Sequence, residues 1–261
     1  MNIVVCIKQV PDTTEIKIDP KTGTLIREGV PTIINPEDKN AIEAALNLCD
    51  NGKVIALSMG PPQAEEALRE ALAMGVDEAI LLCDRKLAGS DTWATANALA
   101  AAIRKLNYDL IICGKQAIDG DTGQVGPQIA ENLGLPQLTY VKRIEIKGDK
   151  LIVSRLLEDG YAVIETKLPA LVTVVGELNK PRYPSLMGIY EAYHKKKVKI
   201  WGVKDIDIDE NKVGLRSSPT QVKRIFTPPP KAGATIIEGS PKEVASKIIK
   251  ILKDKEIIQE F

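Results

Sequence analysis

A polar, glycine-rich turn at residues 114–127 (GKQAIDGDTGQVGP) has a composition suited to binding an anion. The apolar residues 110–113 before it predict a short buried strand, and the residues after it predict a helix. Glycines at 114, 120, 123 and 126 would let backbone amides approach a ligand. A helix that starts near Gly123, with Asp121 or Thr122 as its N-cap, would point free N–H groups and its positive dipole end at a phosphate.

The glycine spacing in this turn matches neither G-x-G-x-x-G nor G-x-x-x-x-G-K-[ST]. An ordinary strand-to-helix connection also uses glycines for its geometry. The turn by itself therefore leaves a nucleotide site and a plain connection both open.

The elements around the turn alternate between strands and helices. Strands are predicted at 2–8, 53–59, 78–83 and 108–113, and helices at 36–49, 61–74 and 91–106, the first capped by Asn35 and the last by Ser90. A β-hairpin at 15–26 interrupts the first unit. This alternation predicts an α/β fold with a mainly parallel, doubly wound sheet and helices on both faces.

The second half of the chain changes its pattern. Residues 139–146, 151–157 and 161–167 predict an antiparallel extension of the sheet, and 170–175 another buried strand. Glu158 and Asp159 precede a glycine and are interpreted as turn formers, not as a catalytic acid and base. The Pro-rich residues 216–230 predict an extended arm, and a capping box at 240–243 starts the last helix.

Ligands of such sheets bind at the carboxyl ends of the strands, where the strand order reverses. The turns at 6–13, 59–62 and 114–126 lie at such ends and carry Gly, Pro or small polar residues. Each turn alone could be a simple connection, but their convergence on one edge favours a nucleotide.

Composition excludes several classes of function. The 261 residues fit one large α/β domain with an appendage or two small domains. Lys plus Arg and Asp plus Glu both count 35, so no broad attraction to nucleic acid or anionic membranes is expected. No apolar run approaches the ~20 residues of a membrane span, and no signal segment precedes the first strand.

The four cysteines at 6, 49, 83 and 113 form no C-x-x-C motif and lie in or beside apolar runs. This arrangement favours reduced, buried thiols over disulfides, zinc or an iron–sulfur cluster, and hence a cytoplasmic protein with no metal site. The single histidine, His194, lacks nearby partners for catalysis and adjoins three lysines, a run that is usually a solvated face and less often steers an acidic partner.

Residues 178–189 (LNKPRYPSLMGI) end in a short, Pro-punctuated amphipathic segment. Its apolar side chains fit either a protruding anchor for a partner or a loop folded back on its own domain.

Several segments together resemble the beta subunit of electron-transfer flavoproteins. These are CIKQVPDT at 6–13, NPED at 35–38, ALSMGP at 56–61, ALAMG at 71–75, GKQAIDGDTGQVGP at 114–127 and LNKPRYPSLMGI at 178–189. The match runs in order from residue 2 to the last helix, and GKQAID combined with the PRY loop is highly specific.

The resemblance implies a Rossmann-like sheet similar to that of adenine nucleotide alpha hydrolases, within a heterodimer whose alpha subunit carries an FAD. Residues 1–215 would form the nucleotide-binding domain, and 216–261 an arm and helix that dock on the alpha subunit. The resemblance places the second nucleotide on Cys6, Asn35, Pro36, Glu37, Asp38, Met59, Gly114, Lys115, Gln116, Ala117, Ile118, Asp119, Gly120, Asp121, Thr122, Gly123, Gln124 and Val125. It assigns the anchoring of partner dehydrogenases to Arg182, Tyr183, Pro184, Ser185, Leu186, Met187, Gly188, Ile189, Tyr190 and Glu191.

Two forms of the family differ at the turn. Classical members hold AMP there, with an acidic-acidic-Cys-Asn-Gln-Thr turn. The sequence GDTGQVGP at 120–127 instead looks like the electron-bifurcating members, although Gly123 stands where Ala or Asn is usual. In those members the site holds FAD, and NADH delivers a hydride to it. One electron then passes through the alpha-subunit FAD to an acyl-CoA or related dehydrogenase, and the other passes to a ferredoxin or flavodoxin.

In either form the flavin carries the chemistry, so no side chain of this chain is expected to be catalytic. The chain would be an electron-carrier subunit, with NADH oxidation belonging to the heterodimer and its complexes. Two other classes remain: an ATP-hydrolysing or stress-type nucleotide-binding domain, although KQVPDT lacks a phosphate-gripping signature, and a scaffold subunit with no nucleotide.

Overall fold

The computed structural model describes residues 1–12, 31–223, 233 and 235–258. The hairpin expected at 15–26 lies outside these residues. The chain divides into two compact units, Met1–Arg224 and Ile225–Phe261.

Within the described residues nine strands form one sheet and two more form a small antiparallel pair. The strands are β1 (Ile3–Cys6), β2 (Gln9–Pro11), β3 (Thr32–Ile34), β4 (Val54–Met59), β5 (Glu78–Leu82), β6 (Leu110–Gly114), β7 (Gln137–Lys147), β8 (Lys150–Leu156), β9 (Tyr161–Lys167), β10 (Ala170–Val174) and β11 (Val198–Trp201). The order in the sheet is β11-β5-β4-β1-β6-β10-β7-β8-β9, and β2 pairs with β3. The strands from β11 to β7 run parallel to their neighbours, whereas β7, β8 and β9 pair antiparallel.

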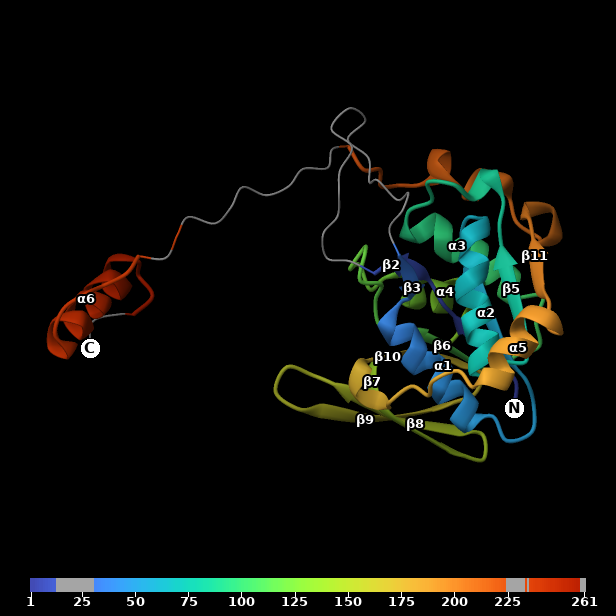
Figure 1. Ribbon diagram of the computed structural model, residues 1–261, viewed down its shortest axis with the longest axis horizontal. Coiled ribbons are helices and arrows are strands. Elements are labelled where there is room, and N and C mark those ends of the chain that lie inside the picture. Colours follow the sequence, from blue (N-terminus) through green and yellow to red (C-terminus); the bar gives the residue numbers. More distant parts are fainter. Residues whose placement is uncertain (13–30, 224–232, 234, 259–261) are drawn as a thin grey trace. The chain divides into compact units, whose positions relative to one another are not determined.

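The helices pack on both faces of the parallel part (Figure 1). They are α1 (Pro36–Leu48), α2 (Glu65–Met74), α3 (Thr92–Ile103), α4 (Val125–Leu133) and α5 (Leu186–His194). The second unit has a helix of its own, α6 (Pro241–Asp254). Short 3-10 turns occur at Pro62–Ala64, Arg85–Leu87, Gly176–Leu178, Val203–Asp205, Glu210–Lys212 and Leu215–Ser217. One core lies under α1, α2 and α5, and the other under α3 and α4.

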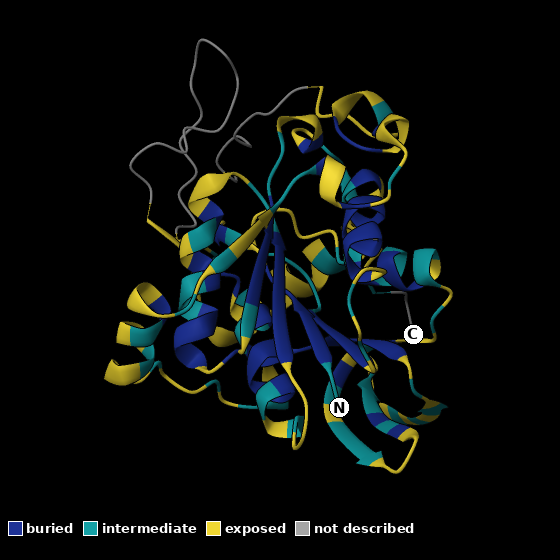
Figure 2. Cartoon of the chain, turned by 90° about the vertical axis from the view of Figure 1, so that its right-hand side faces the viewer, coloured by how far each residue is buried: buried dark blue, intermediate teal, exposed yellow. Residues whose placement is uncertain are grey.

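The apolar strands explain this two-sided packing. Every residue of β1 (IVVC) is buried, as are the first four of β6, and Figure 2 shows the central strands enclosed. Alternate residues of such strands face opposite cores, so helices must cover both faces. The expected α/β fold with a doubly wound, mainly parallel sheet and an antiparallel extension is therefore confirmed.

The strand order reverses at β1. From β1 the chain builds β4 and β5 on one side, then crosses to β6 and β10 on the other. Cys6 and Cys113 are partners in the pairing of β1 with β6, so the turns after both strands leave the sheet side by side at its carboxyl edge. That edge is where a ligand of a doubly wound sheet binds.

The predicted helix starts were wrong in two places. Asp91, not Ser90, caps α3, because its carboxylate accepts from the Ala94 N–H at 3.0 Å while the Ser90 hydroxyl donates to the Leu87 carbonyl. Helix α4 begins at Val125 with Gln124 at the N-cap position, later than the start expected near Gly123. By contrast, the capping box of α6 is confirmed, with Ser240 and Glu243 bonded reciprocally.

The edge strand β11 was not predicted. It has four residues (VKIW) and pairs parallel with β5. A run this short between a lysine cluster and a glycine carries too weak an alternation to be recognised as a strand.

We expect Asp91→Ala to lower the free energy of unfolding by about 1–3 kcal/mol. Besides capping α3, the Asp91 carboxylate accepts from the backbone N–H and hydroxyl of Thr220 at 2.9 and 2.8 Å, so its loss leaves several donors without a partner. Urea unfolding of the purified protein measures the change. Asp209→Ala, which removes the cap of an exposed 3-10 turn, is the control and should cost less than half as much. Equal losses would contradict the anchoring role of Asp91.

Candidate functional site

The turn after β6 is held by the first turn of α1. Asn35 occupies the N-cap position of α1 but makes no side-chain cap bond there. Its amide instead donates to the Gln116 carbonyl at 2.9 Å and accepts from the Ile118 N–H at 3.0 Å. Glu37 accepts from the Gln116 N–H at 3.0 Å. Three bonds from two side chains thus fix the backbone of the turn.

Lys8, which the sequence did not single out, joins the turn from the other side. Its ammonium group binds both oxygens of Asp119 at 2.7 and 2.8 Å, and its backbone N–H donates to Asp38 at 2.7 Å. Since Lys8 follows β1, the turns after the two central strands are tied directly to each other. Its place in a strand-end turn was the available signal, but its partner 111 residues away could not be inferred.

Asp38 is a buried carboxyl group at the centre of this arrangement, with 6% of its surface exposed. It accepts from the Lys8 and Gly114 N–H groups at 2.7 and 3.2 Å. Burial nevertheless raises the pKa of Asp38 to about 7, against the hydrogen bonds of Asn35, Lys8 and Gly114, which favour the ionised form. The group is therefore poised to exchange a proton near neutral pH.

Glycine is required where the turn leaves the sheet. A Cβ atom on Gly114 would lie 2.3 Å from Asp38 Oδ1, so β6 and α1 can approach only with glycine here. Farther along, Gly123 has φ +62 and Asp121 φ 52, both left-handed. A Cβ on Gly120 would meet no heavy atom within 4 Å. The turn is thus tight at its root and open at its tip.

The expected capping by Asp121 or Thr122 was wrong. Asp121 accepts from the side-chain amide of Gln116 within the turn, and the left-handed backbone at 121 and 123 delays the helix until Val125. Gln124 meets the hydroxyl of Thr92, at the start of α3, with 3.0 Å between the two oxygens. The starts of α3 and α4 therefore lie together at the tip of the turn, a juxtaposition that the sequence analysis missed.

An open cavity of about 480 Å³ lies at the root of the same turn. It is lined by Glu37, Lys115, Tyr140, Leu156, Val175, Gly176 and Glu177. The Lys115 ammonium lies 3.5 Å from Glu37 and 5.7 Å from the centre of the Tyr140 ring. Sequence reasoning found Glu37 and Lys115 but missed Tyr140, which lies at a register shift within the pairing of β7 with β10.

The remaining predicted nucleotide contacts lie on this edge of the sheet. Cys6 is the last residue of β1, and it pairs with Cys113, which precedes the end of β6 and was not itself a predicted contact. The hydrogen bond with Cys6 and burial raise the pKa of the Cys113 thiol. Met59 ends β4, beside β1. Within the described residues no group of His, Cys, Asp and Glu could hold a metal ion. No helix among them is long and apolar enough to cross a membrane.

Residues 182–191, which we name the recognition segment after their predicted role, enter helix α5 and expose their apolar side chains. Tyr183 and Leu186 are each 89% exposed, and Met187 63%. Ile189 and Tyr190 are exposed as well. These neighbouring apolar groups form a protruding surface of the kind that marks a protein interface, so the folded-back alternative does not describe Tyr183 and Leu186.

Close backbone contact fixes α5 against α2. A Cβ on Gly188 would lie 2.3 Å from the Ala73 carbonyl oxygen, so only glycine permits this approach. Arg69 of α2 donates to the Ala192 carbonyl at 2.6 Å, and the Tyr193 hydroxyl donates to Glu66 at 2.6 Å. The inner face of α5 is therefore bound to α2 while its outer face is free of the described chain.

We expect the stability of the protein to fall as pH rises from about 4 to about 7, and Asp38→Asn to flatten this decline. Because the folded pKa of about 7 exceeds the unfolded value of 3.8, the folded state binds more protons in that window. The penalty grows to about 4 kcal/mol at and above neutrality. Urea unfolding between pH 4.5 and 7.5 measures it. Asp84→Asn is the control, because the pKa of Asp84 is lowered and its titration falls below this window. An unchanged slope in Asp38→Asn would contradict the burial of this charge.

Comparison with known proteins identifies the family. The family model described as "Electron transfer flavoprotein domain" matches residues 22–205. "Electron transfer flavoprotein subunit beta" of Thermoanaerobacterium thermosaccharolyticum is 58% identical over 99% of this chain and 100% of its own length, and that of Clostridium acetobutylicum 55% identical over the same shares. "Caffeyl-CoA reductase-Etf complex subunit CarD" of Acetobacterium woodii is 56% identical, again over 99% of this chain and 100% of its own. The chain therefore belongs to the electron transfer flavoprotein family, among its beta subunits.

Proposed function

We propose that this chain is the beta subunit of an electron-bifurcating electron-transfer flavoprotein and binds FAD at the turn after β6. The heterodimer would take a hydride from NADH. One electron would pass through the alpha-subunit FAD to an acyl-CoA or related dehydrogenase, and the other to a ferredoxin or flavodoxin.

The space around the turn carries this proposal. The tip at Gly120 is open, and the cavity of about 480 Å³ lined by Lys115 lies at the root of the same turn. FAD has an adenosine on one side of its pyrophosphate and a flavin group on the other, and both need room. AMP has only an adenosine and a single phosphate. The 56% identical relative from Acetobacterium woodii, named as a subunit of a caffeyl-CoA reductase complex, supports a link with a CoA-ester reductase.

The chain's own residues would bind and orient the nucleotide. The free amides at the start of α4, near Gly123 to Val125, would face the pyrophosphate, with the dipole of the helix favouring its charge. Met59 would border the adenosine, while Asn35, which is fully buried, would hold the turn from behind through Gln116 and Ile118. Lys115 and Tyr140 would face the far end of the ligand from the cavity. When bound, the flavin supplies the exchange between a hydride and single electrons.

Asp38 would influence this site through the turn. It bonds to the amides of Lys8 and Gly114, the residues at which both turns leave the sheet. Its charge would therefore change the electrostatic potential near the ligand. No described side chain needs to exchange a proton with substrate.

The alternative within the family is a structural AMP, as in classical members. The open tip would then be filled by solvent, and the chain would carry no flavin itself. In both forms we propose pairing with an alpha subunit, docking of residues 216–261 on it, and a cytoplasmic location.

The recognition segment would anchor the dehydrogenase. Its apolar side chains project from a helix whose inner face is already bound to α2, so a partner could bury them without unfolding anything. Exposed aromatic and aliphatic groups of this kind supply most of the binding energy of protein interfaces.

Counting the nucleotides of the co-expressed heterodimer tests the proposed cofactor. Chromatography of the denatured protein should give about two FAD per heterodimer and no AMP. One FAD and one AMP would overturn the bifurcating assignment and support the classical form. The absence of any nucleotide from the beta subunit would favour a scaffold.

Leu186→Ala should raise the KM for a purified acyl-CoA dehydrogenase about tenfold or more, because an anchor that is 89% exposed would lose its contact with the partner. Steady-state electron transfer between the two proteins gives KM, and absorbance gives the flavin content, which should not change. Ile200→Ala is the control, since Ile200 is 61% exposed on β11 outside the recognition segment. A KM equal to that of the unaltered protein would refute the anchor.

A further inference from the structure

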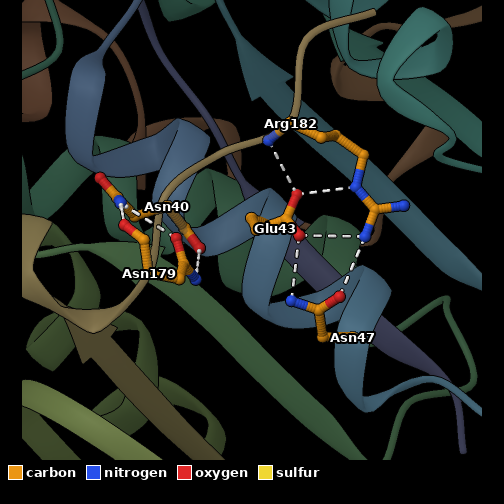
Figure 3. A network of polar contacts seen from close by, with 5 residues as sticks. All are labelled: Asn40, Glu43, Asn47, Asn179 and Arg182. Carbon is orange, nitrogen blue, oxygen red and sulfur yellow. Dashed lines mark hydrogen bonds and ion pairs between the residues drawn. The ribbon is translucent and has the colours of Figure 1, made fainter. Parts of the chain in front are cut away.

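A buried carboxylate on α1 holds the chain at the start of the recognition segment. Glu43 is 7% exposed and accepts four hydrogen bonds (Figure 3). Its Oε2 atom accepts from the backbone N–H and the Nε of Arg182 at 3.0 and 2.7 Å. Its Oε1 atom accepts from Nη2 of Arg182 and from Nδ2 of Asn47, both at 3.0 Å.

A second contact fixes the same segment about one turn earlier on α1. The Asn40 side chain donates to the Asn179 carbonyl at 2.8 Å and to its side-chain oxygen at 3.0 Å, while Asn179 donates back to the Asn40 carbonyl at 3.0 Å. Residues 40, 43 and 47 lie on one face of α1, because they are spaced by three and four. Residues 179–182 are thus hydrogen-bonded to α1 at two successive points, as Figure 3 shows.

The chemistry of the Glu43 contact makes it selective for one geometry. A buried carboxylate is tolerated when both oxygens are satisfied, and a guanidinium meets them through two parallel bonds. The hydrogen bonds with Arg182 lower the pKa of Glu43, and the same contact raises the pKa of Arg182. The backbone N–H of residue 182 joins the pair, so the contact fixes the main chain as well as a side chain.

The connection from this contact to α5 is short, so the position of Arg182 determines where α5 begins. Only residues 183–185 separate Arg182 from Leu186, and prolines stand at 181 and 184. Proline restricts its own φ and the conformation of the residue before it. Helix α5 has nine residues, too few to be stable in isolation, and so depends on its attachments.

The same helix, α1, also holds the turn after β6. Asn35 and Glu37 bond to that turn, and Glu43 lies about 10 Å farther along the helix. The recognition segment is thereby attached to the element that positions the nucleotide turn.

We propose that Glu43 is a positioning residue for partner docking: through Arg182 it holds the recognition segment in its binding conformation without touching the partner. This inference rests on the proposed docking function of α5. Loss of the contact would leave residues 179–185 free to move, and docking would then have to order them again, which weakens affinity.

Glu43→Gln and Glu43→Ala in the heterodimer, with a purified acyl-CoA dehydrogenase as the probe, test the inference. We expect KM for the dehydrogenase to rise about threefold in Glu43→Gln, which keeps one oxygen acceptor, and about tenfold in Glu43→Ala. The rate at saturating dehydrogenase and the flavin content should stay at the level of the unaltered protein. The double variant Arg182→Gln/Glu43→Gln should raise KM no more than the worse of the two single variants, Arg182→Gln and Glu43→Gln, because the two side chains act as one unit.

Lys39→Gln is the matched control. Lys39 also lies on α1 and forms an ion pair with Glu70 of α2 at 2.8 Å, so its loss weakens the same helix without reaching residues 179–182. It should leave KM unchanged.

The results separate this inference from the docking proposal. If Leu186→Ala raises KM but both Glu43 variants match Lys39→Gln, the positioning role is wrong while docking through α5 stands. If the Glu43 variants lose flavin and saturating rate at an unchanged KM, Glu43 is merely structural and the inference is overturned. If Leu186→Ala also leaves KM unchanged, the docking surface is wrong and the inference falls with it.

Discussion

The site depends on the first turn of α1 bonding to another segment rather than to itself. A helix start has free N–H groups, and an asparagine at the N-cap position ordinarily satisfies one of them. Here the Asn35 side chain bridges the Gln116 carbonyl and the Ile118 N–H instead, and Glu37 takes the Gln116 N–H. The helix gives up local capping to fix a loop that has no regular structure of its own, so the position of that loop follows the packing of α1 on the sheet.

Asp38 shows the cost of bringing two turns so close. The N–H groups of Lys8 and Gly114 both need an acceptor where the central strands end, and one carboxyl group serves both. Burial opposes its ionisation, which is why its pKa is raised despite these donors. Gly114 is the other half of the arrangement, because a larger residue would separate β6 from α1 and expose the carboxyl group to water.

The sequence sufficed for features that depend on local pattern. Apolar strands with intervening helices predicted the sheet, and the strand-end rule located the turn at 114–126 before any family resemblance was used. Features that depend on distant partners escaped it. Lys8 with Asp119 and Glu43 with Arg182 are pairs separated by 111 and 139 residues, so nothing in their neighbourhood indicates them. The start of α4 was misplaced because the left-handed conformation of Asp121, which is not a glycine, is set by its contact with Gln116.

The rigid mounting of α5 has a consequence for the free protein. A segment fixed by its contacts with α1 and α2 does not turn these apolar groups inward, so Tyr183 and Leu186 are exposed to water in the chain on its own. Such a surface can adhere to any complementary apolar patch, including that of a second copy. At the end of α5 the ion pair of Lys195 with Glu191 places charge beside these apolar groups. The exposure that would serve docking therefore also gives the free chain an apolar surface open to self-association.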